Sequence, residues 1–368
     1  MCVIAHPGSM CCSSVEIGRD ESSQSVTISV VTTVRLTGTL SPAVRDMADL
    51  EVIGLLAAAE QLQDRAAQLN AALVHTKPTE ARHEQVAHAL ATGRVVSAEK
   101  CENGFGHITY RVIMEEPDTK RRMRAFFKPS VEGNCDGWHR AEVEAVAYQL
   151  NRLLGMDYVP PSVFRPTADV DWRHFERGGV FMYWAEGGRT LNEQPMDQWG
   201  VQPAIVLSDA RVLDVLMQNS DRHHGHFLWA EHWSRGSLQD SGAWQGDLAP
   251  VFIDHAAGFR HGACVEMRHD NAYGTGPTEQ VSASTFLRLR CLDRASLSHA
   301  MSGLLSAEEV DQVMRRRDGL LLYLDHLVAE RGYDQVVLEP HPPHQQQQQQ
   351  GQEQEQQLQQ EQQQLQQV

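Results

Sequence analysis

The sequence predicts an α+β fold in which a strand-rich segment precedes a helical one. Residues 108–114 alternate apolar and polar side chains with a period of two, which is typical of a half-buried strand. An apolar helical run over 212–217 and a long amphipathic pattern over 306–332 dominate the second half. The 368 residues suffice for one large domain or two lobes, with additional segments at the ends.

Composition and charge exclude several functional classes. Hydrophobic residues make up 41% and charged residues 22%, which is typical of a soluble globular protein. A formal net charge of −16 argues against a nucleic-acid binder, which would present a basic face. The one basic cluster, residues 120–124, is expected in a solvated hairpin turn. No window is long and apolar enough for a membrane span.

The N-terminus and the cysteines bear on the compartment. The first residues lack the basic segment and apolar core of a signal peptide, which predicts an unexported protein, unless the true start lies further upstream, and leaves a cytoplasmic location open. Seven cysteines occur without a CxxC pair, so neither a zinc ribbon nor a thioredoxin-like motif is expected. Free thiols and a disulfide between Cys264 and Cys291 both remain open.

Both ends of the chain differ from its middle. Residues 1–40 are rich in Ser, Thr and Val without an amphipathic period, which predicts disorder or a loose strand over 26–34. Residues 41–93 predict a helical extension whose second helix, over 79–93, begins with a capping threonine. Residues 337–368 become rich in glutamine and predict a disordered tail, which could become helical on a partner.

Three predicted strands between 94 and 129 have the pattern of a roof over a nucleotide. Gly104 and Gly106 lie in the first turn, and the third strand ends in Lys128. Glycines let a backbone approach phosphates closely, and a lysine supplies a point charge to them. The segment therefore predicts phosphate binding.

A helix should follow this roof. It is expected to run from Asp136 or Gly137 to Leu154. Glu144 lies at the edge of its apolar stripe, where it can reach a strand lysine and orient the ammonium toward phosphates, whereas Glu142 is expected to be solvated. A strand over 179–184 and a hinge over 185–188 are predicted next.

Two aspartates lie beside buried elements in the second half. Ser208 is expected to cap a helix over 209–218, which leads to Asp221. A short β-prone run delivers Asp254 33 positions later. Phosphoryl transfer needs one carboxylate near the attacking hydroxyl and one on a metal ion. This spacing predicts Asp221 in the first role and Asp254 in the second.

Four motifs follow one another along the chain: Ala125-Phe126-Phe127-Lys128-Pro129, residues 141–155 with Val159-Pro160-Pro161, Asp221-Arg222-His223-His224, and Phe252-Ile253-Asp254 with Gly258-Phe259. In this order they resemble the atypical kinases of the secretory pathway, the group of the Golgi casein kinase, glycan xylosylkinase and four-jointed kinases. The resemblance covers roughly 94–332. Residues 221–226 and Ile253-Asp254-His255 are also similar to a bacterial kinase-like family distantly akin to phosphoinositide kinases.

The resemblance implies a two-lobed, atypical protein-kinase-like fold. The β-rich N-lobe would be residues 94–187 and the helical C-lobe residues 188–336. The implied activity is transfer of the γ-phosphate of ATP to a hydroxyl of a protein Ser/Thr or a glycan. The implied location is the Golgi lumen or another part of the secretory pathway, in contrast to the unexported protein that the N-terminus predicts.

The resemblance also implies a role for each site residue. Lys128 would contact the phosphates of ATP, with Glu144 as its partner and Gly104 and Gly106 in the roof. Asp221 would be the catalytic aspartate, and Asp254 would hold Mn²⁺ or Mg²⁺. Arg222 is expected to anchor the loop.

The chain departs from the family pattern near the metal. His226 stands where kinases usually carry Asn, and His255 and Ala256 replace an Asn-Gly pair. Imidazole suits Mn²⁺ better than Mg²⁺. Two alternatives to an active kinase remain. One is a pseudokinase, a nucleotide-binding scaffold without turnover, and the other is a zinc protein or hydrolase built on the histidines around Asp221 and Asp254.

Overall fold

The computed structural model describes part of the chain, in two units, Met1–Ala81 and Arg82–Val368. The described residues are 9–20, 25–36, 80–102, 108–130, 140–233, 237–238, 244–245, 247–259 and 278–339. In the first unit, β1 (Ser9–Asp20) pairs antiparallel with β2 (Ser25–Leu36). The β-branched residues that fill β2 favour this conformation. Of the two states expected near 26–34, the structure has the strand.

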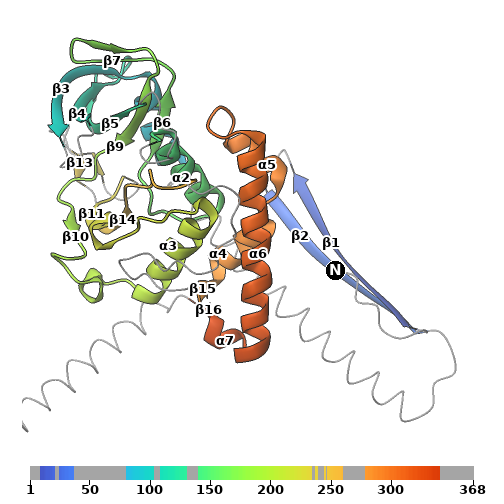
Figure 1. The fold of residues 1–368 in the computed structure, drawn as a ribbon. Helices are drawn as coiled ribbons and strands as arrows, with labels where there is room; N and C mark the ends of the chain where they lie inside the picture. Colours follow the sequence, from blue (N-terminus) through green and yellow to red (C-terminus); the bar gives the residue numbers. More distant parts are fainter. Residues whose placement is uncertain are drawn as a thin grey trace, which may run out of the picture. The chain divides into compact units, whose positions relative to one another are not determined.

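A five-stranded antiparallel sheet forms the β-rich part of the second unit (Figure 1). Its order is β3-β4-β5-β9-β6. The strands are β3 (Arg94–Glu102), β4 (Ile108–Glu115), β5 (Arg122–Pro129), β6 (Ser162–Arg165) and β9 (Gly179–Tyr183). In β4, Tyr110, Val112 and Met114 are buried. The alternation predicted from the sequence is therefore present and leaves the other face of the sheet free to line a site.

The basic cluster is only partly in a turn. Residues 117–119 form the turn after β4, whereas β5 already begins at Arg122. Lys120, Arg121, Arg122 and Arg124 are exposed, so the expected solvation of the cluster is confirmed. Residues 122–124, however, lie in β5 rather than in the turn. Because side chains alternate along a strand, Arg124 lies on the same face of β5 as Phe126 and Lys128.

Helix α2 (Glu142–Leu153) packs against β6 and β9. It ends through Leu154, and Gly155 follows with φ +66°, so the predicted C-terminus is confirmed. The N-terminus differs from the prediction, because Arg140 is not helical. The Arg140 guanidinium donates to the Leu304 carbonyl at 3.0 Å. A helix over 80–92, whose last part packs with this unit, matches the second helix expected in the extension.

Helix α3 (Pro203–Met217) begins earlier than predicted. Ser208 lies inside it and donates its hydroxyl to the Ile205 carbonyl at 2.8 Å, so its expected capping role is wrong. Pro203 explains the earlier start, since proline fits the first turn of a helix. Gln218 ends the helix in the left-handed conformation, with φ 55°.

The second unit also contains short elements. The three-stranded sheet β10-β11-β14 comprises β10 (Arg189–Thr190), β11 (Phe227–Glu231) and β14 (Leu248–Phe252). The one-turn 3₁₀ helices are η1 (Met196–Trp199) and η2 (His224–His226). The remaining hairpins are formed by β7 (Ala168–Val170) with β8 (Arg173–Phe175) and by β12 (Ser237–Leu238) with β13 (Trp244–Gln245).

The C-terminal part is helical. Its helices are α4 (Ala283–Cys291), α5 (Arg294–Ala300), α6 (Ala307–Arg331) and α7 (Tyr333–Val336). β15 (Val281–Ser282) pairs parallel with β16 (Val337–Leu338). The predicted capping box of α6 is confirmed: Ser306 accepts from the Glu309 amide at 3.2 Å, and the Ser306 amide donates to the Glu309 carboxylate at 2.8 Å.

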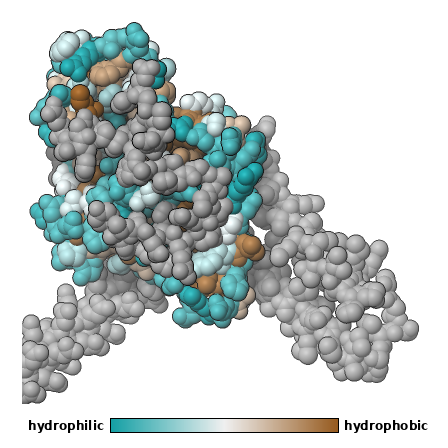
Figure 2. Space-filling model, in the orientation of Figure 1, coloured by the Kyte–Doolittle hydropathy of each residue, from teal (hydrophilic) through white to brown (hydrophobic). Residues whose placement is uncertain are grey.

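The second unit thus mixes a sheet-rich part with a helical part, and each has a hydrophobic core. One core joins α2, α3 and α6, and the other lies in the sheet around Phe127 and Phe181, whose ring centroids are 4.5 Å apart. On the face shown in Figure 2, hydrophobic residues are isolated among hydrophilic ones. Among the described helices, none has the length and apolar character to cross a membrane.

Several predictions fall on residues outside the described ranges. They are the first helix of the extension, the turn with Gly104 and Gly106, Cys264 with its possible disulfide, and the predicted tail from residue 340 onward. The first residues of that predicted tail, Val337–Leu338, form β16 instead.

Candidate functional site

A cavity of about 1570 Å³ lies beneath the five-stranded sheet. Side chains of β3, β4, β5 and β9 line it from the sheet, together with the segment 183–188. Loop residues around Asp221 and Asp254 line it from the helical part. Most ligand pockets enclose roughly 300–1,000 Å³, so this cavity can hold a nucleotide together with an acceptor group.

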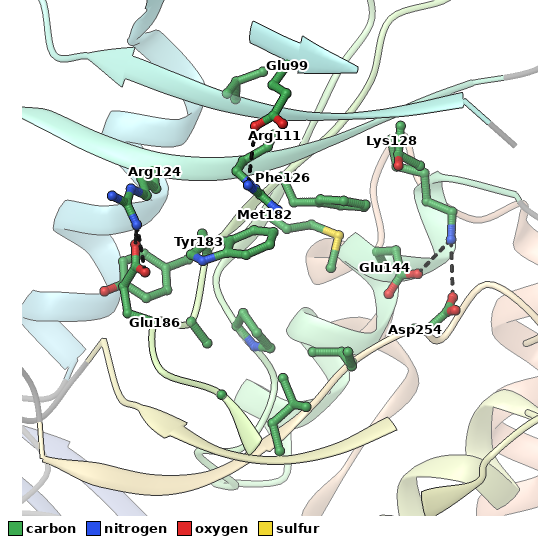
Figure 3. A pocket seen from close by; sticks show the side chains of 18 of the residues that line it. Glu99, Arg111, Arg124, Phe126, Lys128, Glu144, Met182, Tyr183, Glu186 and Asp254 are labelled. Carbon is green, nitrogen blue, oxygen red and sulfur yellow. Dashed lines mark hydrogen bonds and ion pairs between the residues drawn. The ribbon is translucent and has the colours of Figure 1, made fainter. Parts of the chain in front are cut away.

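Lys128 projects into the cavity from β5 and meets two carboxylates (Figure 3). Its Nζ atom lies 3.1 Å from Oε1 of Glu144 and 3.3 Å from Oδ1 of Asp254. Burial would lower the pKa of Lys128, but the two carboxylates raise it above its usual value. Lys128 therefore stays an ammonium at neutral pH and joins β5, α2 and the segment after β14.

Glu144 is completely enclosed, with 1% of its side chain exposed. Its Oε2 atom accepts from the His255 backbone N–H at 3.0 Å and lies 3.2 Å from His255 Nδ1. Burial would raise the pKa of Glu144, but Lys128 and the His255 donors hold it far below its usual range. The carboxylate is thus ionised and fixed from two sides.

His255 is a supporting residue whose role sequence reasoning missed. Burial is the main cause that lowers its pKa, so the ring is neutral, and Nδ1 must carry the proton to donate to Glu144. The backbone N–H contributes as well, which any residue could supply. No sequence signal shows that the residue after Asp254 reaches α2.

Asp254 follows β14 in a left-handed conformation, with φ 54°. Aspartate tolerates this region better than most residues, and the turn directs its carboxylate to Lys128. The side chain is half exposed toward the cavity. Desolvation would raise its pKa, but the nearby Lys128 ammonium lowers it overall. An ionised, accessible carboxylate is therefore available at this position.

Arg222 anchors the loop between α3 and β11, as the sequence predicts. The residue is fully buried and ion-paired with Asp214 on α3, with Nη2 3.0 Å from Oδ1. Its Nη1 donates to the Ile253 carbonyl at 2.9 Å. Arg222 thereby holds the segment with Asp254 next to the loop that carries Asp221.

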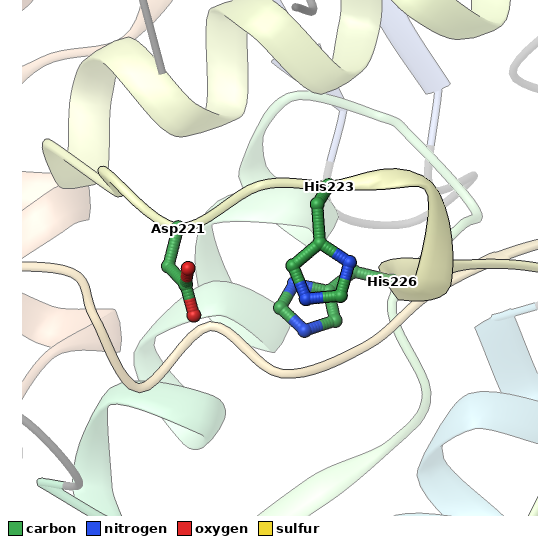
Figure 4. A group of neighbouring side chains, drawn as sticks. All are labelled: Asp221, His223 and His226. Atoms are coloured by element: carbon green, nitrogen blue, oxygen red, sulfur yellow. The ribbon is translucent and has the colours of Figure 1, made fainter. Parts of the chain in front are cut away.

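Asp221 lies at the start of this loop and lines the cavity. Its backbone N–H donates to the Asn219 side chain at 3.2 Å. Asp221, His223 and His226 each offer a ligand atom within 4.8 Å of the others (Figure 4). Taken alone, this grouping could hold a metal ion.

The tautomer of His223 argues against that use. Its Nδ1 atom accepts from the Gly225 backbone N–H at 3.0 Å, so a neutral ring carries its proton on Nε2. A nitrogen that bears a proton cannot bind a metal. The close approach also depends on glycine, because a Cβ at position 225 would lie 2.9 Å from the His223 ring. His223 is therefore arranged as a hydrogen-bond donor, which weakens the zinc alternative.

His226 fits a metal better. Its side chain is 8% exposed, and Nε2 lies 3.6 Å from Oδ2 of Asp254. Burial lowers the pKa of His226 to about 4, although Asp254 opposes this shift. Within the described residues its Nδ1 atom has no hydrogen-bond partner. A neutral imidazole beside an ionised carboxylate is a donor pair that suits Mn²⁺ and other borderline ions.

The structure thus brings five of the predicted site residues to one cavity: Asp221, Lys128, Glu144, Asp254 and His226. Gly104 and Gly106 lie outside the described residues. Arg124 and Glu186, which also line the cavity, were not identified as site residues from the sequence. Their ion pair joins positions 62 residues apart, and no local sequence pattern predicts it.

Comparisons with known proteins found a structural similarity that is too low to assign a family. No protein family and no curated protein matches the chain. A solved structure of hydra Fam20 with sugar is similar at a TM-score of 0.47 and 15% identity, covering 70% of this chain and 92% of that chain. A similarity at this level does not show the family, so the function rests on the site itself.

Proposed function

We propose that the protein is an ATP-dependent kinase that transfers the γ-phosphate to a hydroxyl of a protein Ser/Thr or a glycan. The observation that carries this proposal is Lys128, held between Glu144 and Asp254 in a cavity that Asp221 also lines. In this proposal residues 94–187 form a β-rich N-lobe, residues 188–336 form a helical C-lobe, and Gly104 and Gly106 lie over the phosphates.

Lys128 neutralises and positions the phosphates of ATP. Its ammonium needs a fixed direction, and Glu144 supplies that direction because both of its oxygens are engaged. Phosphoryl transfer asks for positioning and charge neutralisation more than for covalent chemistry. A rigid lysine therefore contributes directly to the rate.

Asp221 accepts or orients the proton of the acceptor hydroxyl. Asp254 and His226 hold the divalent ion, Mn²⁺ or Mg²⁺, which when bound neutralises charge on the phosphates. Arg222 holds the segments that carry Asp221 and Asp254 next to each other, through its contacts with Asp214 and the Ile253 carbonyl. The proposed compartment is the Golgi lumen or another part of the secretory pathway, which is what the sequence resemblance to secretory-pathway kinases implies.

A nucleotide-binding pseudokinase is the second candidate. The reason for considering it is the set of residues near the proposed metal ion. There His226 replaces the usual Asn, and the buried Ala256 offers no ligand atom. Thermal-shift titration with ATP, with and without Mn²⁺, distinguishes the two. Metal-independent stabilisation without phosphate transfer would favour the scaffold, whereas metal-dependent stabilisation accompanied by transfer supports the kinase.

Phosphate transfer from labelled ATP tests the proposal most broadly. The acceptors are a casein-type peptide, a xylose-containing glycan and an inositol lipid, each assayed with Mn²⁺ and with Mg²⁺. The proposal predicts transfer to the peptide or the glycan, and loss of that transfer in D254N. D169N is the matched control, since Asp169 lies on β7, is 84% exposed and does not line the cavity. Transfer to none of the acceptors would favour the scaffold.

A further inference from the structure

The cavity face of the sheet extends well beyond Lys128. Arg124, Phe126 and Lys128 alternate along β5 and all line the cavity. Lys128 is four steps along the extended strand from Arg124, which corresponds to about 13 Å. An extended nucleoside triphosphate has a similar length between its terminal phosphate and its base. With the phosphates at Lys128, the base would lie near Arg124.

The Arg124 end of the cavity carries an ion pair with Glu186 from the segment after β9 (Figure 3). Nη1 of Arg124 lies 3.0 and 2.9 Å from the two carboxylate oxygens of Glu186. Within the described residues, this contact engages one of the three guanidinium nitrogens. The pair therefore keeps N–H donors and carboxylate lone pairs for a ligand.

Flat and apolar surfaces lie beside this pair. Phe126 faces Met182 across β5 and β9, and both line the cavity. The rings of Phe126 and Trp184 have centroids 6.3 Å apart. Leu228 on β11 and Ile253 after β14 also line the cavity. A planar base can stack in such a space while its edge faces charged groups.

We infer that Arg124 and Glu186 recognise the base edge of the nucleotide and select adenine over guanine. This inference rests on the proposed function. Adenine presents an exocyclic amino group beside ring-nitrogen acceptors, which match a carboxylate and a guanidinium respectively. Guanine places the O6 acceptor where adenine has its amino group, and O6 would face the Glu186 carboxylate. A site that leaves such groups unpaired discriminates strongly.

Binding measurements with three ligands test the inference. They are ATP, GTP and inorganic tripolyphosphate, a base-free probe of the phosphate end, all with Mn²⁺. The wild type should prefer ATP over GTP. E186Q should reduce that preference by about tenfold or more, because the glutamine amide can donate to O6, and it should leave tripolyphosphate affinity unchanged.

The charge-swap variant R124E/E186R separates base recognition from a structural ion pair. It keeps an ion pair between the strand and the segment after β9 but reverses the groups that face the base. The inference predicts that the swap loses adenine preference while its unfolding transition stays near that of the wild type. R122A is the control, because Arg122 pairs with Glu115 on the same sheet at 3.2 Å without lining the cavity.

Two results would overturn the inference. If both E186Q and the swap bind ATP and GTP with the wild-type ratio, the pair is only a structural contact and the proposed kinase function still stands. If the wild type binds neither ATP nor tripolyphosphate, the proposed function fails together with the inference.

Discussion

Glu144 and His255 are joined through two donors of the same residue, the backbone N–H at 3.0 Å and the ring Nδ1 at 3.2 Å from one carboxylate oxygen. The other oxygen of Glu144 contacts Lys128. Because His255 directly follows Asp254, this contact ties α2 to the segment that carries the proposed metal ligand. The two carboxylates that contact Lys128, Glu144 and Asp254, are therefore also connected to each other through His255.

We expect H255A to destabilise the protein and to impair transfer. The change removes one hydrogen bond to a buried charge, which costs about 1.5–3 kcal/mol in the free energy of unfolding. H255N can still donate from its side-chain amide and should recover part of both losses. Chemical denaturation and phosphate transfer measure the two effects. Equal behaviour of H255A and H255N would contradict the contact.

Removing the lysine charge should affect stability and activity together. K128M leaves the buried Glu144 carboxylate with its His255 donors alone, and breaking a buried ion pair costs about 3–5 kcal/mol. Phosphate transfer should be lost, since nothing else lines the phosphate end with a comparable charge among the described residues. Circular dichroism during denaturation and transfer assays provide the measurements. R94M, in an exposed ion pair with Glu115, is the control.

His226 makes stability depend on pH in a defined window. Its pKa is about 4 in the folded state against 6.5 for an unperturbed histidine, so the unfolded chain binds more protons between these values. The contribution of His226 to the free energy of unfolding is fully present above pH 6.5. It is lost as the pH falls toward 4, which lowers the free energy of unfolding by roughly 3 kcal/mol. H226Q should flatten this part of the unfolding profile. H174Q, a change at an exposed histidine, should not.

His226 should also set the metal preference. An imidazole ligand favours Mn²⁺, whereas Mg²⁺ prefers oxygen ligands. Transfer by the wild type should therefore be faster with Mn²⁺, and H226N should shift the ratio toward Mg²⁺. Rates with each ion at saturating ATP measure the shift. If H226N and the wild type had the same ratio of rates with Mn²⁺ and Mg²⁺, the proposed role of His226 as a metal ligand would be contradicted.

Part of this site could be predicted from the sequence because it follows local periodicity. The two-residue period of β5 places Lys128 on the cavity face, and the apolar stripe of α2 places Glu144 at its edge. The rest depends on tertiary contacts. The His255 contact needs the left-handed turn at Asp254, and the Arg124–Glu186 pair joins distant segments. The capping role given to Ser208 was wrong because α3 already starts at Pro203, six residues before the predicted start.

In the proposed mechanism, Asp221 acts on the acceptor hydroxyl while Lys128 and Asp254 bind the nucleotide. The most direct measurement is phosphate transfer by D221N with Mn²⁺, with ATP affinity measured on the same sample. D221N should keep the ATP affinity of the wild type and lose transfer by about 100-fold or more, the contribution of a positioned general base. Full transfer by D221N would contradict this mechanism.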